Sequence, residues 1–160
     1  MAEKTTGTDR GSLIALRLAY YGEVIVALLA LPARGFAPPR PLLAGIGLLL
    51  MLVGLILRMA AGRALGKWWS LRAEVKDGQP LITGGVYRFM RHPSYLGMLL
   101  VCLGIPIAFQ SMWAAVVMGL GVWPAVGHRI QVEEELLARH YGDEYQEYAR
   151  RTARLIPGVF

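Results

Sequence analysis

Residues 93–127 read PSYLGMLLVCLGIPIAFQSMWAAVVMGLGVWPAVG and contain no Asp, Glu, Lys, Arg or His. As a single helix this run would be about 50 Å long, well beyond the roughly 30 Å hydrocarbon thickness of a bilayer. It must therefore fold back on itself, and soluble proteins rarely bury a hairpin of this kind. The stretch predicts an integral membrane protein.

The most polar point of this run is Gln110-Ser111, so we place the turn of the hairpin there. Two further apolar segments precede it. The chain is 160 residues long and 55% hydrophobic, which suits one domain. We predict an all-α integral membrane domain covering residues 1–160, with about four transmembrane helices at 12–31, 41–61, 94–110 and 111–127.

The basic residues indicate an orientation. The chain has 17 Lys and Arg against 11 Asp and Glu, a net charge of +6, and most of the charge lies between the apolar segments. This distribution is typical of a membrane protein rather than of a nucleic-acid-binding protein. The positive-inside rule places both termini and the segments 62–92 and 128–160 in the cytoplasm. The richness in Ala, Gly and Arg favours a bacterial plasma membrane.

Two clusters of reactive side chains flank the predicted hairpin. One, Arg91-His92-Pro93-Ser94-Tyr95, comes before the third span, and the other, Arg129 to Glu135, follows the fourth. Each has a simpler reading. The first cluster suits membrane anchoring by snorkelling and aromatic-belt residues, and the second suits a solvated helix face. If the two spans are antiparallel neighbours, however, both clusters meet in one cytoplasmic site.

The remaining signals concern helix packing and the C-terminal segment. Glycines in the second span suit close helix packing: Gly45, Gly47 and Gly54. After the fourth span the periodicity predicts an amphipathic helix broken at Gly142, followed by a second one over 143–153. Three tyrosines at helical spacing across this break, Tyr141, Tyr145 and Tyr148, are expected to pack against the 62–92 loop. The single cysteine, Cys102, is expected to be a buried core residue.

Four ordered pieces of the sequence carry a resemblance to a known family. They are LITGGVYR at 81–88, RHPSYLG at 91–97, Arg129-Ile130 with Glu133-Glu134, and YGDEYQEY at 141–148 with Ile156-Pro157. In this set the chain resembles the isoprenylcysteine carboxyl methyltransferases and the related phospholipid methyltransferases. The resemblance covers roughly residues 80–160. It implies methyl transfer from S-adenosylmethionine, with S-adenosylhomocysteine as product, to a lipophilic acceptor that comes from the bilayer.

The residue chemistry suits such a cofactor. Arg91, His92 and the helix start at Pro93 are expected to meet its carboxylate, and Glu133 its ribose hydroxyls or amino group. Aromatic faces, such as Tyr87, Tyr95 or Trp68, favour the sulfonium cation. The expected cofactor-binding set is Tyr87, Arg91, His92, Pro93, Tyr95, Gly97 and Glu133. No metal site is expected, because direct displacement from a sulfonium needs alignment and desolvation.

For the acceptor, Arg129 is expected to hold a carboxylate through two guanidinium contacts, with Glu134 fixing the Arg129 geometry. The favoured acceptor is the carboxylate of an isoprenylcysteine-like or isoprenoid molecule. Phospholipid amines, lipophilic thiols, an NADPH-dependent sterol-type reductase and a non-enzymatic membrane protein remain open. A reductase would recruit Lys67, Arg72 or Lys76 for the 2′-phosphate. Two ionisable residues within the first span, Arg17 and Glu23, are weaker functional candidates.

Overall fold

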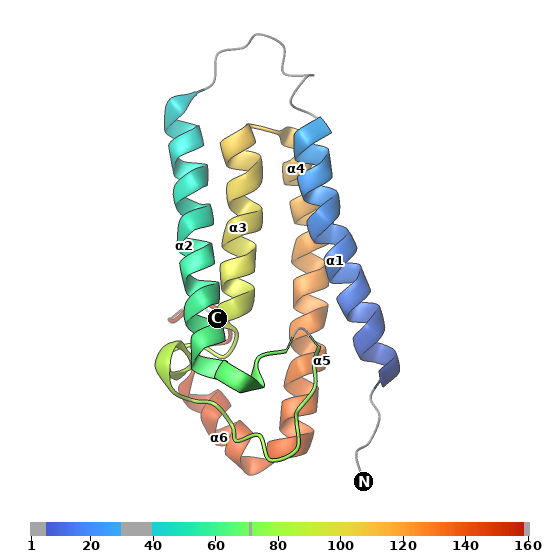
Figure 1. Cartoon of the computed structure of the whole chain (residues 1–160), viewed down its shortest axis with the longest axis vertical. Coiled ribbons are helices and arrows are strands. Elements are labelled where there is room, and N and C mark those ends of the chain that lie inside the picture. Colours follow the sequence, from blue (N-terminus) through green and yellow to red (C-terminus); the bar gives the residue numbers. More distant parts are fainter. Residues whose placement is uncertain (1–5, 30–39, 71, 159–160) are drawn as a thin grey trace.

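The computed structural model describes residues 6–29, 40–70 and 72–158, which form helices and loops with one isolated β-bridge between Met90 and Ala153. The expected all-α architecture is confirmed (Figure 1). The elements are α1 (Thr6–Leu29), α2 (Pro41–Leu65), the 3-10 helices η2 (Gly66–Trp68) and η3 (Gly85–Arg88), α3 (Pro93–Phe109), α4 (Met112–Val117), the π-helical η4 (Met118–Val122), α5 (Trp123–Tyr141) and α6 (Asp143–Arg151).

Helices α2 and α3 form an antiparallel pair whose backbones approach at two glycine contacts. A Cβ atom on Gly54 would lie 2.4 Å from the carbonyl oxygen of Gly97, and one on Gly47 would lie 2.6 Å from that of Gly104. No residue larger than glycine fits at such contacts. Close packing was therefore predicted correctly for Gly47 and Gly54. It was wrong for Gly45, which has no neighbour within 4 Å because it lies on the outer face of α2.

The hairpin turn lies where the polar Gln110-Ser111 pair predicts it. Gln110 adopts the left-handed conformation with φ 50°, and the Ser111 hydroxyl accepts a hydrogen bond of 3.2 Å from the amide of Ala114. This N-cap starts α4, which continues through η4 and α5 as one long helix (Figure 1). The π-helical segment inserts its wider turn in the middle of that helix.

Helix α1 lies along α4 and α5, and α2 lies along α3 (Figure 1). The buried core joins α1, α3 and the long helix, and Cys102 belongs to it as expected; its members are Leu16, Met98, Leu99, Cys102, Val122, Val126 and Ile130. The two outer helices therefore pack against different neighbours: α2 against α3, and α1 mainly against the long helix.

Two helices meet the length and hydropathy required of a membrane span, Gly11–Leu29 and Pro41–Trp68. Only 17% and 11% of their most apolar windows are buried, so neither is the core helix of a soluble protein. Their outward surfaces are apolar, with Leu18, Leu48 and Leu49 more than half exposed. Helix α3 is apolar but shorter, at 17 residues.

The start of α1, the segment that follows α2 and helix α6 all lie at one end of the bundle (Figure 1). Gly142, with φ 54°, ends α5 and separates it from α6, as predicted. Helix α6 ends at Arg151, two residues earlier than expected, because Ala153 pairs with the chain before α3. The segment 32–40, between the first two predicted spans, lies outside the described residues apart from Arg40.

The glycine contacts predict a position-specific effect on stability. Gly54→Ala is expected to lower the stability of the protein by about 1–3 kcal/mol, because the new methyl group collides with the backbone of α3. The measurement is thermal unfolding in detergent. Gly45→Ala, on the same helix, is the control and should leave the melting temperature unchanged or slightly higher. Equal melting temperatures for the two variants would contradict the packing argument.

Candidate active site

The residues before α3 are held by the C-terminal segment of the chain. The amide of Arg91 donates to the carbonyl of Ala153 at 2.9 Å, and that of His92 donates to the carbonyl of Arg154 at 3.2 Å. In return the amide of Ala153 donates to Phe89 at 3.2 Å. These bonds fix the Arg91-His92 pair between the end of α6 and the start of α3.

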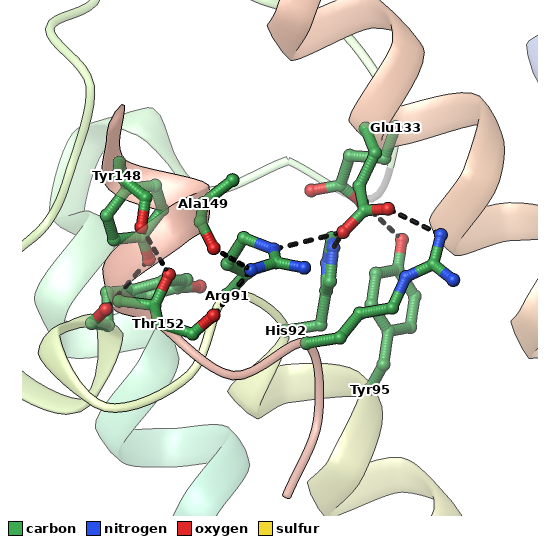
Figure 2. A network of polar contacts seen from close by, with 10 residues as sticks. Arg91, His92, Tyr95, Glu133, Tyr148, Ala149 and Thr152 are labelled. Carbon is green, nitrogen blue, oxygen red and sulfur yellow. Dashed lines mark hydrogen bonds and ion pairs between the residues drawn. The ribbon is translucent and has the colours of Figure 1, made fainter. Parts of the chain in front are cut away.

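The Arg91 side chain connects α5 and α6 (Figure 2). Its Nη1 donates to the carbonyl oxygens of Ala149 at 2.7 Å and Thr152 at 2.5 Å, and its Nε donates to Glu134 at 3.1 Å. Three of its five N–H groups therefore donate hydrogen bonds within the protein. Nη2 has no hydrogen-bond partner among the described residues, and Arg91 lines the cavities described below.

The Glu134 carboxylate gathers three cationic or polar partners. Its Oε1 accepts from Arg91 at 3.1 Å and lies 3.2 Å from Nε2 of His92, while its Oε2 accepts from Arg154 at 2.5 Å. Burial by itself would raise the pKa of Glu134, but the hydrogen bonds from His92, Arg154 and Arg91 outweigh it and lower the pKa to about 2. We expected Glu134 to fix Arg129; its contacts are instead with these three residues.

Arg129 is almost fully buried, at 1% exposure, and orients a tyrosine. Its Nε donates to the hydroxyl of Tyr95 at 3.2 Å, and its Nη1 donates to Ser12 of α1 at 2.8 Å. The Tyr95 hydroxyl in turn donates to Glu133 at 2.7 Å. Arg129 is not among the residues that line the two cavities described below, and its expected contact with an acceptor stays a prediction.

A cavity of about 390 Å³ lies between α1, α2 and α3. Its inner wall is polar and includes His92, Tyr95 and Glu133, whereas much of the rest is apolar: Leu13, Leu16, Leu55, Leu65, Met98 and Val101. The cavity opens between α1 and α2, where the lining residues Tyr21 and Leu55 are 60% and 50% exposed. It therefore connects the polar cluster with the outer, apolar surface of the bundle.

A second cavity of about 90 Å³ adjoins the first and shares six lining residues with it: Leu65, Ser70, Arg72, Tyr87, Arg91 and Glu133. It is bounded by the tyrosine stripe of α5 and α6, whose packing against the loop is observed. Tyr141 donates to the carbonyl of Gln79 at 2.9 Å, and Tyr148 to that of Tyr87 at 2.7 Å. Burial raises the pKa of Tyr148 to about 12, so its hydroxyl stays a donor at neutral pH.

The other expected cofactor-binding residues lie in different places. Tyr87 lines both cavities. Pro93 is buried at the first turn of α3 and lines neither. Gly97 packs against α2, where a Cβ atom would lie 2.7 Å from Cγ of Arg58, so its role is to admit the Arg58 side chain. Gly97 lines neither cavity, and its expected contact with the cofactor stays a prediction.

Sequence reasoning missed Arg58, Trp69 and Arg154. Arg58 and Trp69 line the larger cavity, and Arg154 binds Glu134. A signal for Arg58 was present, because it follows sixteen uncharged residues from Leu42 to Leu57, and a guanidinium within a span is a functional candidate.

The ionisable residues of the first span differ in their surroundings. Arg17 is exposed and lines the larger cavity. Glu23 is fully buried, and neither of its carboxylate oxygens has a hydrogen-bond partner among the described residues. Within those residues no three His, Cys, Asp or Glu side chains form a metal-binding group.

The lowered pKa of Glu134 predicts a pH-dependent stability. The carboxylate contributes stability above its ordinary pKa of 4.5, and this contribution is lost as the pH falls towards 2. Glu134→Gln should reduce the melting temperature at neutral pH and flatten its dependence on pH between about 4.5 and 2. Glu135→Gln, an exposed neighbour paired with Arg139, is the control. An unchanged pH profile in Glu134→Gln would contradict the assignment.

Comparisons with known proteins place these features in a family. Protein-S-isoprenylcysteine O-methyltransferase A of Arabidopsis thaliana is 36% identical over 115 residues, which are 71% of this chain and 58% of that protein. Protein-S-isoprenylcysteine O-methyltransferase of Homo sapiens is 33% identical over 115 residues, 71% of this chain and 40% of that protein. The chain thus spans between about two fifths and three fifths of the length of these relatives.

A solved structure shares the fold. The eukaryotic intramembrane Ras methyltransferase ICMT (isoprenylcysteine carboxyl methyltransferase) superposes with a TM-score of 0.70 at 24% identity, over 89% of this chain and 52% of that chain. The chain therefore has the fold of an integral membrane protein. The model of the family described as phospholipid methyltransferase matches residues 43–144, from α2 into α6. The resemblance inferred from the motifs is confirmed: this chain belongs to the phospholipid methyltransferase family.

Proposed function

We propose that this protein is a membrane methyltransferase that transfers a methyl group from S-adenosylmethionine to the carboxylate of an isoprenylcysteine-like or isoprenoid acceptor. One observation carries the proposal: a single cavity joins a polar cluster at the ends of the helices to an apolar opening between α1 and α2. Such a cavity suits a reaction between a polar cofactor and a lipophilic acceptor. The names of the relatives support a carboxyl acceptor.

The residues around the two cavities fit the cofactor. Arg91 keeps Nη2 for a carboxylate, and Glu133 presents a carboxylate for hydroxyl or amino groups. Tyr87 and Tyr95 offer aromatic faces that favour a sulfonium cation. The proposed cofactor-binding set is therefore Tyr87, Arg91, His92, Tyr95 and Glu133. The combined cavity volumes are in the usual range for small-molecule sites, roughly 300–1,000 Å³.

When bound, S-adenosylmethionine would supply a methyl group already activated by its sulfonium. The protein then has to align the reactants and exclude water. Leu16, Met98 and Val101 line the cavity beside the polar cluster, and these apolar side chains would help to exclude water from it. Glu134 holds Arg91 and His92, and Arg129 holds the Tyr95 hydroxyl. In this proposal Arg129 and Glu134 are positioning residues.

We further propose four membrane-crossing segments, formed by α1, α2, α3 and the continuous α4–η4–α5 helix. The six basic residues from Arg63 to Arg91 lie at the end of the bundle that carries the site. By the positive-inside rule this end faces the cytoplasm, where a soluble cofactor is supplied. The acceptor would enter from the bilayer between α1 and α2.

The test is calorimetric titration of the detergent-purified protein with S-adenosylhomocysteine and, separately, with NADPH. We expect saturable binding of the nucleoside thioether and none of NADPH. Glu133→Gln should weaken that binding by about tenfold or more, because it removes a charged hydrogen-bond acceptor at the cavity wall. Glu135→Gln, exposed on the same helix, is the matched control.

If NADPH binds and S-adenosylhomocysteine does not, the proposed methyltransferase function is wrong and a reductase function is favoured. Absence of binding by either compound would mean that the polar cluster is structural. If S-adenosylhomocysteine binds, the acceptor class follows from methyl transfer to an S-farnesylcysteine, compared with transfer to phosphatidylethanolamine. Transfer to the amine alone would overturn the carboxylate assignment.

A further inference from the structure

Most of the ionisable side chains among the described residues that line the larger cavity are basic. Four guanidinium groups belong to it, those of Arg17, Arg58, Arg72 and Arg91, together with the imidazole of His92. The single carboxylate among these lining residues is Glu133, which already accepts a hydrogen bond from Tyr95. The charge of this wall therefore favours an anionic molecule over a cationic amine.

Among the lining guanidinium groups, that of Arg58 follows the longest uncharged stretch, the sixteen residues 42–57 of α2. Its Nη1 donates to the carbonyl oxygen of Ser94 at 3.1 Å, and the described residues provide no carboxylate partner for it. A guanidinium at this depth is costly unless it is paired or reaches water. Its presence beside a cavity calls for an anionic ligand.

The packing of α2 against α3 gives Arg58 its place. The absence of a side chain at Gly97 leaves room for the aliphatic part of Arg58, and Gly54 brings the two backbones together one turn earlier. The Arg58 side chain is therefore half-buried and confined against α3. A confined guanidinium loses less conformational entropy when it binds a carboxylate than a free one would.

The opposite wall of the cavity comes from α1. Arg17 lines it with Tyr20 and Tyr21. Two guanidinium groups from separate helices thus flank an opening whose remaining walls are largely apolar. This arrangement is complementary to an amphiphile with an anionic head and a hydrocarbon chain.

We propose that Arg58, assisted by Arg17, binds the carboxylate of the lipophilic acceptor and sets the preference of the site for acids; this inference rests on the proposed methyl transfer. In the reaction a carboxylate oxygen forms a bond to the methyl carbon, and the bond from that carbon to sulfur breaks with its electron pair going to sulfur. The carboxylate becomes a neutral ester and the sulfonium a neutral thioether. The guanidinium groups therefore hold the substrate more tightly than the product, which favours release of the ester.

The experiment compares the binding of N-acetyl-S-farnesylcysteine and its methyl ester to the full chain in detergent, by calorimetry. The wild type should bind the acid about ten- to a hundredfold more tightly than the ester, as expected for a charge-assisted hydrogen bond. Arg58→Gln should bring this ratio close to one, Arg58→Lys should restore part of it, and Arg17→Gln should reduce it partly. Arg63→Gln, exposed on the same helix and outside the cavity, should retain the wild-type ratio.

Binding of S-adenosylhomocysteine to each variant reports whether the variant is folded and the cofactor site intact. An unchanged acid-to-ester ratio in Arg58→Gln and Arg17→Gln would overturn the inference and leave the methyltransferase proposal standing. Equal binding of acid and ester by the wild type would also overturn it. If the ratio depends on Arg58 but S-adenosylhomocysteine does not bind, the anion site stands and the proposed function fails. Lysophosphatidic acid bound as tightly as the acid would overturn the preference for a carboxylate.

Discussion

The site depends on how closely the backbones of α2 and α3 approach. In a bilayer the lipid tails are as apolar as the helix surfaces, so helices associate through close packing and polar contacts rather than through burial of apolar area. The paired glycines Gly54–Gly97 and Gly47–Gly104 supply that close packing. Because α2 lies directly against α3, the Arg58 side chain reaches the first turn of α3. Helix α1 packs mainly against α4 and α5 instead, and the larger cavity lies between α1, α2 and α3.

A second constraint closes the polar end of this helix pair. Glu134 on α5 binds Arg91 and His92 before α3 and Arg154 after α6, so one carboxylate connects three parts of the chain. The burial of this carboxylate is tolerable because its partners are cationic or hydrogen-bonding groups. The result is a rigid inner wall beside a cavity that opens toward the outer surface of the bundle. Rigid polar groups at one end and an apolar opening at the other are what a cofactor and a lipophilic acceptor would each require.

The motif residues of this protein differ in whether they line the cavities. Arg129 and Glu134 belong to the sequence motifs but line neither cavity; Arg129 donates to Tyr95, and Glu134 contacts Arg91 and His92. The groups that face the cavity include Arg17 and Arg58, which belong to no recognised motif. The space that a ligand would occupy is therefore lined both by motif residues, such as Arg91, His92 and Glu133, and by less conspicuous residues on α1 and α2.

The sequence by itself determined the helical architecture, the turn at Gln110-Ser111, the break at Gly142 and the meeting of the two clusters around the hairpin. Each of these follows from local signals: charge-free length, one polar dipeptide, one glycine and the antiparallel geometry of a hairpin. Only the tertiary structure decided which oxygen each guanidinium binds. In it the Glu134 carboxylate contacts Arg91, His92 and Arg154 rather than Arg129. It also decided that Gly97 packs and Gly45 does not, and that Arg58 faces the cavity. These choices depend on distances between helices and on the rotation of each helix about its axis, which the spacing of residues along one chain does not specify.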